Sequence, residues 1–380
     1  MTLANRQWLS PFMRQSRQEG RGDADAALLA PDARQAAALR PGPPILLVTV
    51  DTEAEFDWEG PFLRSLTSVR NVREQQAAQA IYDRFGVRPT YFVDYAVATQ
   101  PEGYLPLCDI AQSGRCEIGA HLHPWITPPL TEELGERSSF SQNLPVALQR
   151  DKLARLTDAI HANFGTRPVC YRAGRLGIGE EAAEILAELG YEIDSSVLSG
   201  IDMRRRHGPD FRRALDRPYW FGRGGRLLEI PVTCGFVGLL SCPAGSRAIG
   251  VDLYHRLRQP LLHRLHVPGV FARLRLLEQI PLSPEGVGFA ELRRLTRILL
   301  GRGQRVFVLM YHSSSLLPGN TQYVRSQLQL SSFLRTIEQY LEFFLGEMGG
   351  VTMTSSELHA VLLQSQDVTK AAATVAAAAR

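Results

Sequence analysis

The chain has 380 residues, of which 44% are hydrophobic, so it can bury the core of one large domain or of two ordinary ones. Its net charge of +3 is too small to indicate a nucleic acid or another polyanion as the partner. Nearly all of the positive charge is arginine, since the lysines are Lys152 and Lys370, which argues against a lysine Schiff base or a P-loop mechanism.

The first 40 residues contain no apolar run of the kind that a secretory signal needs, and no later segment approaches the length of a membrane span. We therefore expect a flexible leader over residues 1–40 and a cytoplasmic protein. The five cysteines are odd in number, widely spaced and without a Cys-x-x-Cys pair. This pattern indicates reduced thiols and argues against a zinc ribbon.

From residue 45 onward, predicted strands and helices alternate. Residues 45–50 follow a proline-rich linker and form an apolar run of branched residues, typical of a strand buried on both faces. Further strands are predicted at 88–93, 116–122, 169–172, 191–193, 227–232 and 305–311, and helices at 72–85, 104–112, 148–163, 180–189 and 326–345. Seven or so alternating units favour an α/β barrel or a doubly wound sheet.

Two regions interrupt the alternation within one expected domain at 41–363. Residues 199–226 are rich in turns and arginine, and residues 241–300 are predicted to form a helical insertion of two or three amphipathic helices. Within this insertion, the basic amphipathic segment around His263 and His266 could contact an anionic membrane surface. Residues 364–380 form an alanine-rich tail that we expect to be disordered or a frayed helix.

Two imidazoles lie one residue apart at the end of the predicted strand 116–122. In an extended segment successive side chains alternate, so His121 and His123 would point the same way and could hold one metal ion. Taken alone, a His-x-His pair is as often part of a surface turn as of a metal site. Asp51 and Glu53 repeat the same spacing at the end of the first strand. Two strand ends of this kind indicate an active site.

Further polar residues follow other predicted strands, at the edge where parallel α/β folds place their active sites. Arg172 and Arg175 follow one strand and His312 the last, although the arginines could also form structural salt bridges. Asp194 could orient His312 or cap a turn. We expect Glu229, inside another strand, to pair with an arginine. Metal-assisted amide hydrolysis needs a cation, a proton-accepting carboxylate and an acid for the leaving group, and this set offers each part.

The order of these motifs resembles the polysaccharide deacetylase family, also called the NodB-homology or carbohydrate esterase family 4 enzymes. The resemblance runs from about residue 45 to residue 315 and is similar in detail to the WalW-like branch, linked to lipopolysaccharide or exopolysaccharide synthesis. The motifs are Thr49-Val-Asp51-Thr-Glu53, Glu117-Ile-Gly-Ala-His121-Leu-His123-Pro, Tyr171-Arg172-Ala-Gly-Arg175, Leu228-Glu-Ile-Pro231 and Leu309-Met-Tyr-His312-Ser.

This resemblance implies a distorted (β/α) barrel of about seven strands, a divalent ion and the hydrolytic removal of an acetyl group from an N-acetylated sugar. The ion is usually zinc, with cobalt, manganese or nickel as other options. By motif position, Asp51 matches the base that accepts a proton from the attacking water, and Arg172 matches the arginine that holds this base. His121 matches the first metal histidine, and His312 matches the acid toward the leaving amine.

The chain departs from the family pattern at two places. Typical members have two adjacent aspartates, of which the second is a metal ligand, whereas Thr52 follows Asp51 here. We assign the ligand role to Glu53, the next carboxylate on the same strand face. Typical members also separate the metal histidines by three residues, which would place the second at Trp125. The resulting expectation is a metal bound by Glu53, His121 and His123, with substrate contacts from Trp125, Arg175 and Asp194.

The sequence therefore predicts a metal-dependent deacetylase that acts on an acetylated saccharide in surface or extracellular polysaccharide metabolism, with the 241–300 insertion shaping the substrate groove. Two alternatives stay open at this point. One is an amide hydrolase of the same fold that acts on a non-sugar amide. The other is a metal-free protein that binds glycans without catalysis. No nucleic acid partner is expected, and the oligomeric state is not indicated.

Overall fold

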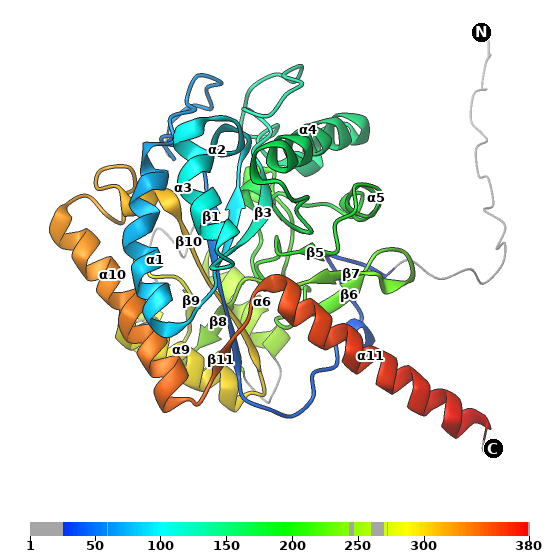
Figure 1. Cartoon of the computed structure of the whole chain (residues 1–380). Helices are drawn as coiled ribbons and strands as arrows, with labels where there is room; N and C mark the ends of the chain where they lie inside the picture. The colour runs from blue at the N-terminus through cyan, green and yellow to red at the C-terminus, as the bar shows by residue number, and fades with distance from the viewer. Residues whose placement is uncertain (1–25, 59, 243–246, 260–269, 272, 379–380) are drawn as a thin grey trace, which may run out of the picture.

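Parallel strands lie side by side at the centre of the molecule, in the order β10-β1-β2-β3-β4-β5-β7 (Figure 1). The computed structural model describes residues 26–58, 60–242, 247–259, 270–271 and 273–378. The strands in this order are β1 (Ile45–Thr52), β2 (Thr90–Val93), β3 (Glu117–Leu122), β4 (Cys170–Ala173), β5 (Ile193–Asp194), β7 (Leu227–Glu229) and β10 (Val306–His312). The short strand β11 (Val351–Thr352) also pairs with β1 in parallel.

Strand β1 shows why the sheet lies at the centre. All eight of its residues are buried. Leu46 and Val48 face one hydrophobic cluster, whereas Ile45 and Leu47 face another on the opposite side of the sheet. Alternating side chains that are apolar on both faces belong to a parallel strand covered on both sides. The apolar run 45–50 therefore becomes a central strand, as predicted.

The sheet curls without closing, and this gives a distorted, open barrel. The strands at its two ends are β10 and β6 (Tyr219–Phe221), the latter antiparallel to β7. A separate two-stranded ribbon of β8 (Cys234–Val237) and β9 (Glu278–Pro281) lies against β10. There the hydroxyl of Thr233 accepts a hydrogen bond from Val308 N at 2.8 Å, and Leu282 O accepts one from Met310 N at 3.1 Å. The predicted fold class is confirmed.

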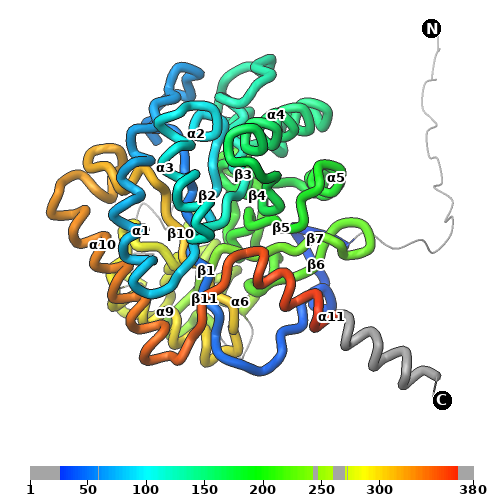
Figure 2. Tube along the Cα trace, viewed as in Figure 1, coloured from blue at the N-terminus to red at the C-terminus, as the bar shows by residue number. Residues whose placement is uncertain are grey.

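Helices cover the outside of this barrel (Figures 1 and 2). Helices α9, α10 and α1 pack in succession beside β1 and β10, and α2, α3 and α4 pack together beside β3. The described helices are α1 (Gln75–Phe85), α2 (Tyr95–Thr99), α3 (Pro101–Gln112), α4 (Val146–Phe164), α5 (Ala182–Glu188), α6 (Arg247–Leu257), α9 (Phe289–Gly301), α10 (Gln327–Glu342) and α11 (Ser355–Ala378). None of them is both long enough and apolar enough to cross a membrane.

A buried lysine on α4 fastens the loop that follows β3. The ammonium group of Lys152 donates hydrogen bonds to the carbonyl oxygens of Pro124, Thr127 and Pro129, at 2.7 to 2.8 Å, and forms an ion pair with Glu132 at 3.0 Å. Its side chain is fully buried. A buried charge is tolerated only when it is paired and hydrogen-bonded in this way. The loop that begins at the carboxyl end of β3 is therefore held rigidly.

The ends of the domain differ in part from the expectation. Residues 1–25 of the expected leader lie outside the described residues, and the expectation of flexibility is wrong for residues 26–40. Leu28 is fully buried, its backbone N–H donates to Glu180, and Ala26 and Ala36 form bridges to the neighbourhood of β6. At the other end, helix α11 continues through the alanine-rich stretch as far as Ala378.

The expected helical insertion at 241–300 contains α6 and α9, together with strand β9, which the sequence did not predict. His263 and His266 lie outside the described residues. All five cysteines are free thiols, as predicted.

Candidate metal centre and active site

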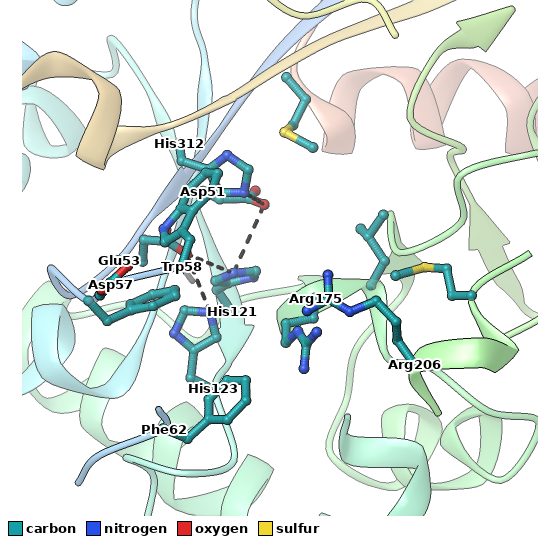
Figure 3. A pocket seen from close by; sticks show the side chains of 14 residues that line it. Asp51, Glu53, Asp57, Trp58, Phe62, His121, His123, Arg175, Arg206 and His312 are labelled. Atoms are coloured by element: carbon teal, nitrogen blue, oxygen red, sulfur yellow. Dashed lines mark ion pairs between the residues drawn. The ribbon is translucent and has the colours of Figure 1, made fainter. Parts of the chain in front are cut away.

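The carboxyl ends of β1, β3 and β10 open into a cavity of about 280 Å³. Its lining includes Asp51, Glu53, His121, His123 and His312, so the polar residues predicted at these strand ends come together (Figure 3). Strand register explains part of this convergence. Asp51 on β1 is paired with His312 on β10, and His121 on β3 is paired with Arg172 on β4.

Glu53, His121 and His123 converge on one buried point. The Nε2 atoms of His121 and His123 lie 3.6 and 3.4 Å from the same Glu53 oxygen, Oε2. The three residues each offer one ligand atom, and these atoms lie within 4.8 Å of one another. All three side chains are at most 2% exposed. The structure thus contains a ligand set with the spacing needed for one metal ion.

The other nitrogen of each imidazole is held from behind. Nδ1 of His121 is 3.0 Å from the carbonyl oxygen of Arg172, and Nδ1 of His123 is 3.2 Å from the carboxylate of Asp94. Because both partners are acceptors, both Nδ1 atoms carry the proton, and the Nε2 lone pairs point toward Glu53. Burial also lowers the pKa of His121 to about 3, so this imidazole is neutral, the form that binds metals.

His123 reaches the centre although its spacing differs from that of the family. Trp125 stacks on its ring, with centroids 4.4 Å apart and an interplanar angle of 21°. On another side, Gly174 approaches so closely that a Cβ atom there would lie 2.4 Å from Cδ2 of His123. Trp125 is only 2% exposed and is not among the lining residues. We therefore correct its expected substrate contact to a supporting contact behind His123.

The donor set fits a divalent cation. Glu53 Oε1 is buried and has no hydrogen-bond partner among the described residues. Burial raises the pKa of Glu53 well above its ordinary value; His312 opposes this shift, and the nearby carboxylates Asp51, Asp94 and Glu285 add to it. A carboxylate in such a place lacks a cationic partner. Two imidazole nitrogens and one carboxylate are a common ligand set for zinc, with room left for water or substrate.

Asp51 is held beside the triad by a fully buried arginine. Arg172 Nη1 donates to Asp51 Oδ1 at 2.6 Å and to Thr49 Oγ1 at 3.1 Å. Its Nε and Nη2 donate to Ser195 O and Oγ, both at 2.8 Å, and its guanidinium lies 4.4 Å from the ring centroid of Phe92. Burial alone would raise the pKa of Asp51, but Arg172 and the two nearby imidazoles hold it at about 2. Asp51 is therefore ionised.

His312 lies on the other side of Asp51, with its Nε2 3.7 Å from Asp51 Oδ2. Its Nδ1 is 2.9 Å from Glu285 Oε2, and its backbone N–H donates to Glu285 Oε1 at 3.1 Å. Burial lowers the pKa of His312, but Glu285, followed by Glu53 and Asp51, raises it to about 10. The ring of Trp58 packs edge-on against it at 4.5 Å. His312 is therefore a protonated group whose Nε2 faces Asp51.

Asp194 and Glu229 lie away from this cavity and form a buried pair. Asp194 accepts hydrogen bonds from the hydroxyl and the N–H of Ser196, at 2.5 and 3.3 Å, so it caps a turn. It does not orient His312, since Glu285 does so, and its full burial excludes the expected substrate contact. The predicted arginine partner of Glu229 is wrong: strand pairing places it opposite Asp194. Burial raises the pKa of both carboxyl groups; Asp194 raises that of Glu229 further, whereas the hydrogen bond with Glu229 lowers that of Asp194.

Sequence reasoning missed several residues that complete the site. Asp94 directly follows β2, so it could have been found as another carboxylate at a strand end. It also caps α2, because its side chain accepts a hydrogen bond from Val97 N at 2.9 Å. Glu285 lies in a loop after β9, and no sequence signal marks it. Trp58 and Phe62, from the loop after β1, line the cavity as well. Arg175 lines the cavity as expected, and it also forms the ion pair of the alternative interpretation, with Glu136 at 3.5 Å.

No protein-family model and no curated protein matches the chain. Solved structures that resemble it include one from Mycobacterium smegmatis, assigned by inference as a polysaccharide deacetylase, at 19% identity and a TM-score of 0.48, covering 87% of this chain and 96% of that chain. Another is the carbohydrate esterase family 4 domain of a xylanase from the hindgut metagenome of Trinervitermes trinervoides, at 11% identity and a TM-score of 0.40, covering 86% and 92%. A third is a pseudoenzyme of the same family from Bacillus anthracis, at 10% identity and a TM-score of 0.38, covering 84% and 66%.

Proposed function

We propose that this protein is a metal-dependent deacetylase that hydrolyses the N-acetyl group of a saccharide. The observation that carries the proposal is the convergence of Glu53, His121 and His123 on one buried point, with Asp51 and His312 directly beside it. The motif order from Asp51 to His312 supports the saccharide as the substrate class, and the buried ligand set supports metal dependence.

Glu53, His121 and His123 would hold the cation, with Zn²⁺ as the expected ion and Co²⁺, Mn²⁺ or Ni²⁺ as substitutes. A cation bound there would polarise the amide carbonyl and increase the acidity of the attacking water. The protein itself fixes the direction of the two imidazoles through Arg172 O and the carboxylate of Asp94. These hydrogen bonds keep the Nε2 atoms available as ligands.

Asp51 accepts the proton of the attacking water at Oδ2. Its other oxygen, Oδ1, is occupied by Arg172 at 2.6 Å, whereas Oδ2 lies between the imidazoles of His121 and His312, at 4.0 and 3.7 Å. A general base must be ionised and fixed within reach of the water. The guanidinium of Arg172 meets both needs, because it lowers the pKa of Asp51 and leaves its carboxylate one orientation.

His312 donates a proton from Nε2 to the nitrogen of the departing amine. Glu285 accepts a hydrogen bond from Nδ1, and this turns Nε2 toward Asp51 and the cavity. The same carboxylate stabilises the protonated imidazole, which is the form that an acid requires. Trp58 packs against the ring and limits the access of water from that side.

The first experiment measures the metal content of the purified protein and the acetate released from oligomers of N-acetylglucosamine. Chelation should abolish acetate release, and zinc or cobalt should restore it. Asp51→Asn should bind metal normally and release no acetate; full activity in this variant would refute the base assignment. Protein without bound metal that still binds the oligomers would identify a glycan-binding protein. Release of acetate from simple amides, and none from sugars, would identify a non-sugar amidohydrolase.

A further inference from the structure

Two arginines form one wall of the cavity. Arg175 and Arg206 both line it, and Figure 3 shows them on one side of the histidine pair, with Asp57 and Trp58 on the other side. Neither arginine takes part in holding Asp51 or the ligand set. We call this pair the arginine wall.

The structure holds Arg175 in an unfavourable backbone conformation. Its φ angle is 56°, in the left-handed region that side chains other than glycine seldom adopt, at a cost on the order of 1 kcal/mol or more. Its guanidinium packs against two aromatic rings, 4.1 Å from the centroid of Phe140 and 5.1 Å from that of Phe62, and donates to Ser139 Oγ. These contacts fix a strained residue at the cavity.

The arginine wall carries more positive charge than its own partner neutralises. Both guanidinium groups approach the same oxygen, Oε1 of Glu136, at 2.7 Å from Arg206 Nε and 3.5 Å from Arg175 Nη2. The side chain of Arg206 is 65% exposed, and neither of its Nη atoms donates a hydrogen bond within the described part of the chain. One carboxylate therefore faces two cations, and donors suited to an oxyanion remain available.

Arg206 lies where the cavity meets a second hollow. This groove of about 470 Å³ shares Trp58, Phe62 and Arg206 with the cavity and continues past Leu134 and Glu136. A molecule whose acetamide group reaches Asp51 and His312 would therefore pass the arginine wall on its way into the groove. An anionic group on the same molecule would meet the Nη donors of Arg206 at this junction.

We propose that the site selects N-acetylated substrates that carry an oxyanion, either a phosphate or a carboxylate, which binds to Arg175 and Arg206. The identity of the amide rests on the proposed function, whereas the anion site rests on the arginine wall alone. Glu136 keeps the two guanidinium groups in place, and the oxyanion supplies the second negative charge.

The test measures binding to the metal-loaded protein by calorimetry, with three probes: N-acetylglucosamine, N-acetylglucosamine 1-phosphate and N-acetylmuramic acid. The phosphate or the carboxylate probe should bind at least about tenfold more tightly than the neutral sugar, as expected for charge-assisted hydrogen bonds, and the two anionic probes show which oxyanion is preferred. Arg206→Ala should reduce this preference about tenfold. The matched control is Arg204→Ala on the same turn, because Arg204 is 58% exposed, pairs with Asp202 and does not line the cavity.

Equal binding of all three probes by the unaltered protein would overturn the anion site. If Arg206→Ala kept the preference for anionic probes, the anion would contact the metal and not the arginine, and the proposal would be overturned. An equal loss of the preference in Arg204→Ala would overturn it as well. Arg175→Met should also lose the preference for anionic probes. If Arg175→Met does not fold, the result for Arg206→Ala alone decides the test. Acetate release is measured separately. An anion preference, together with no acetate release from these probes or from oligomers of N-acetylglucosamine, would refute the deacetylase function and retain the anion site.

Discussion

The floor of the cavity and the arginine wall are held by different means. Asp51, His121 and Arg172, which we call the strand floor, lie on strands β1, β3 and β4 of the parallel sheet. Arg175 and Arg206 lie on turns beyond the strands, and aromatic rings and a shared carboxylate hold them. Strand register places Asp51 opposite His312 and His121 opposite Arg172, whereas the wall depends on contacts between distant loops. Changes to the floor should therefore affect folding as well as activity, whereas a change to the exposed Arg206 in the wall should affect binding alone.

The largest effect is expected for Arg172→Met in the strand floor. This change leaves the carboxylate of Asp51 buried without its cation, which costs roughly 3–5 kcal/mol of the free energy of unfolding. Denaturant unfolding at neutral pH measures the loss. Arg204→Met is the control in an exposed pair, and its effect should stay below about 1 kcal/mol. A similar small change for Arg172→Met would mean that the floor does not depend on this ion pair.

A smaller effect is expected for Gly174→Ala, at the boundary between floor and loops. The added methyl group would meet the ring of His123 and the carbonyl oxygen of Leu122, at 2.4 and 2.5 Å, so His123 must move. Displacement of a ligand by its surroundings typically weakens metal binding by roughly 10- to 100-fold. Competition with a zinc-binding dye measures the affinity. Gly301→Ala is the control, because nothing lies within 4 Å of the added atom; unchanged affinity in Gly174→Ala would exclude His123 as a ligand.

Glu285→Gln tests whether a loop residue can tune a strand residue. Glu285 raises the pKa of His312, so its loss lowers that pKa, and the protonated acid disappears at a lower pH. The alkaline limb of the pH–rate profile should therefore move to lower pH, and kcat on the alkaline side should fall by roughly 10- to 100-fold, within the range of general acid catalysis. An unshifted limb with a uniformly lower kcat would show that Glu285 only positions the ring.

The same contrast explains what the sequence could predict. The apolar runs identified the central strands, and the alternation of side chains placed His121 and His123 on one side and Asp51 beside Glu53. Glu285 and Arg206 could not be predicted, because they reach the cavity from loops whose course depends on tertiary packing. Trp125 shows the limit of motif position. It was expected near the substrate, yet stacking on His123 buries it. Strand β9 was missed because its four residues lie within a segment of helical pattern.

The smallest effect on activity is expected from Glu229→Gln, which tests a buried carboxyl pair outside the cavity. Burial, with the nearby Asp194, raises the pKa of Glu229 well above its usual value, so the folded protein keeps a proton that the unfolded chain releases above about pH 4.5. Stability should therefore fall as the pH rises above about 4.5, by at most about 1.4 kcal/mol per pH unit for this group. The glutamine amide does not titrate, and it can donate a hydrogen bond to Asp194 as the protonated carboxyl of Glu229 does. The free energy of unfolding of the variant should therefore decrease less with rising pH, and at neutral pH it should equal or exceed that of the unaltered protein. Unfolding free energies measured across this pH range give the slope. An equal slope in both proteins would show that the pair does not retain the proton, whereas unchanged deacetylation in the variant would place Glu229 outside the strand floor.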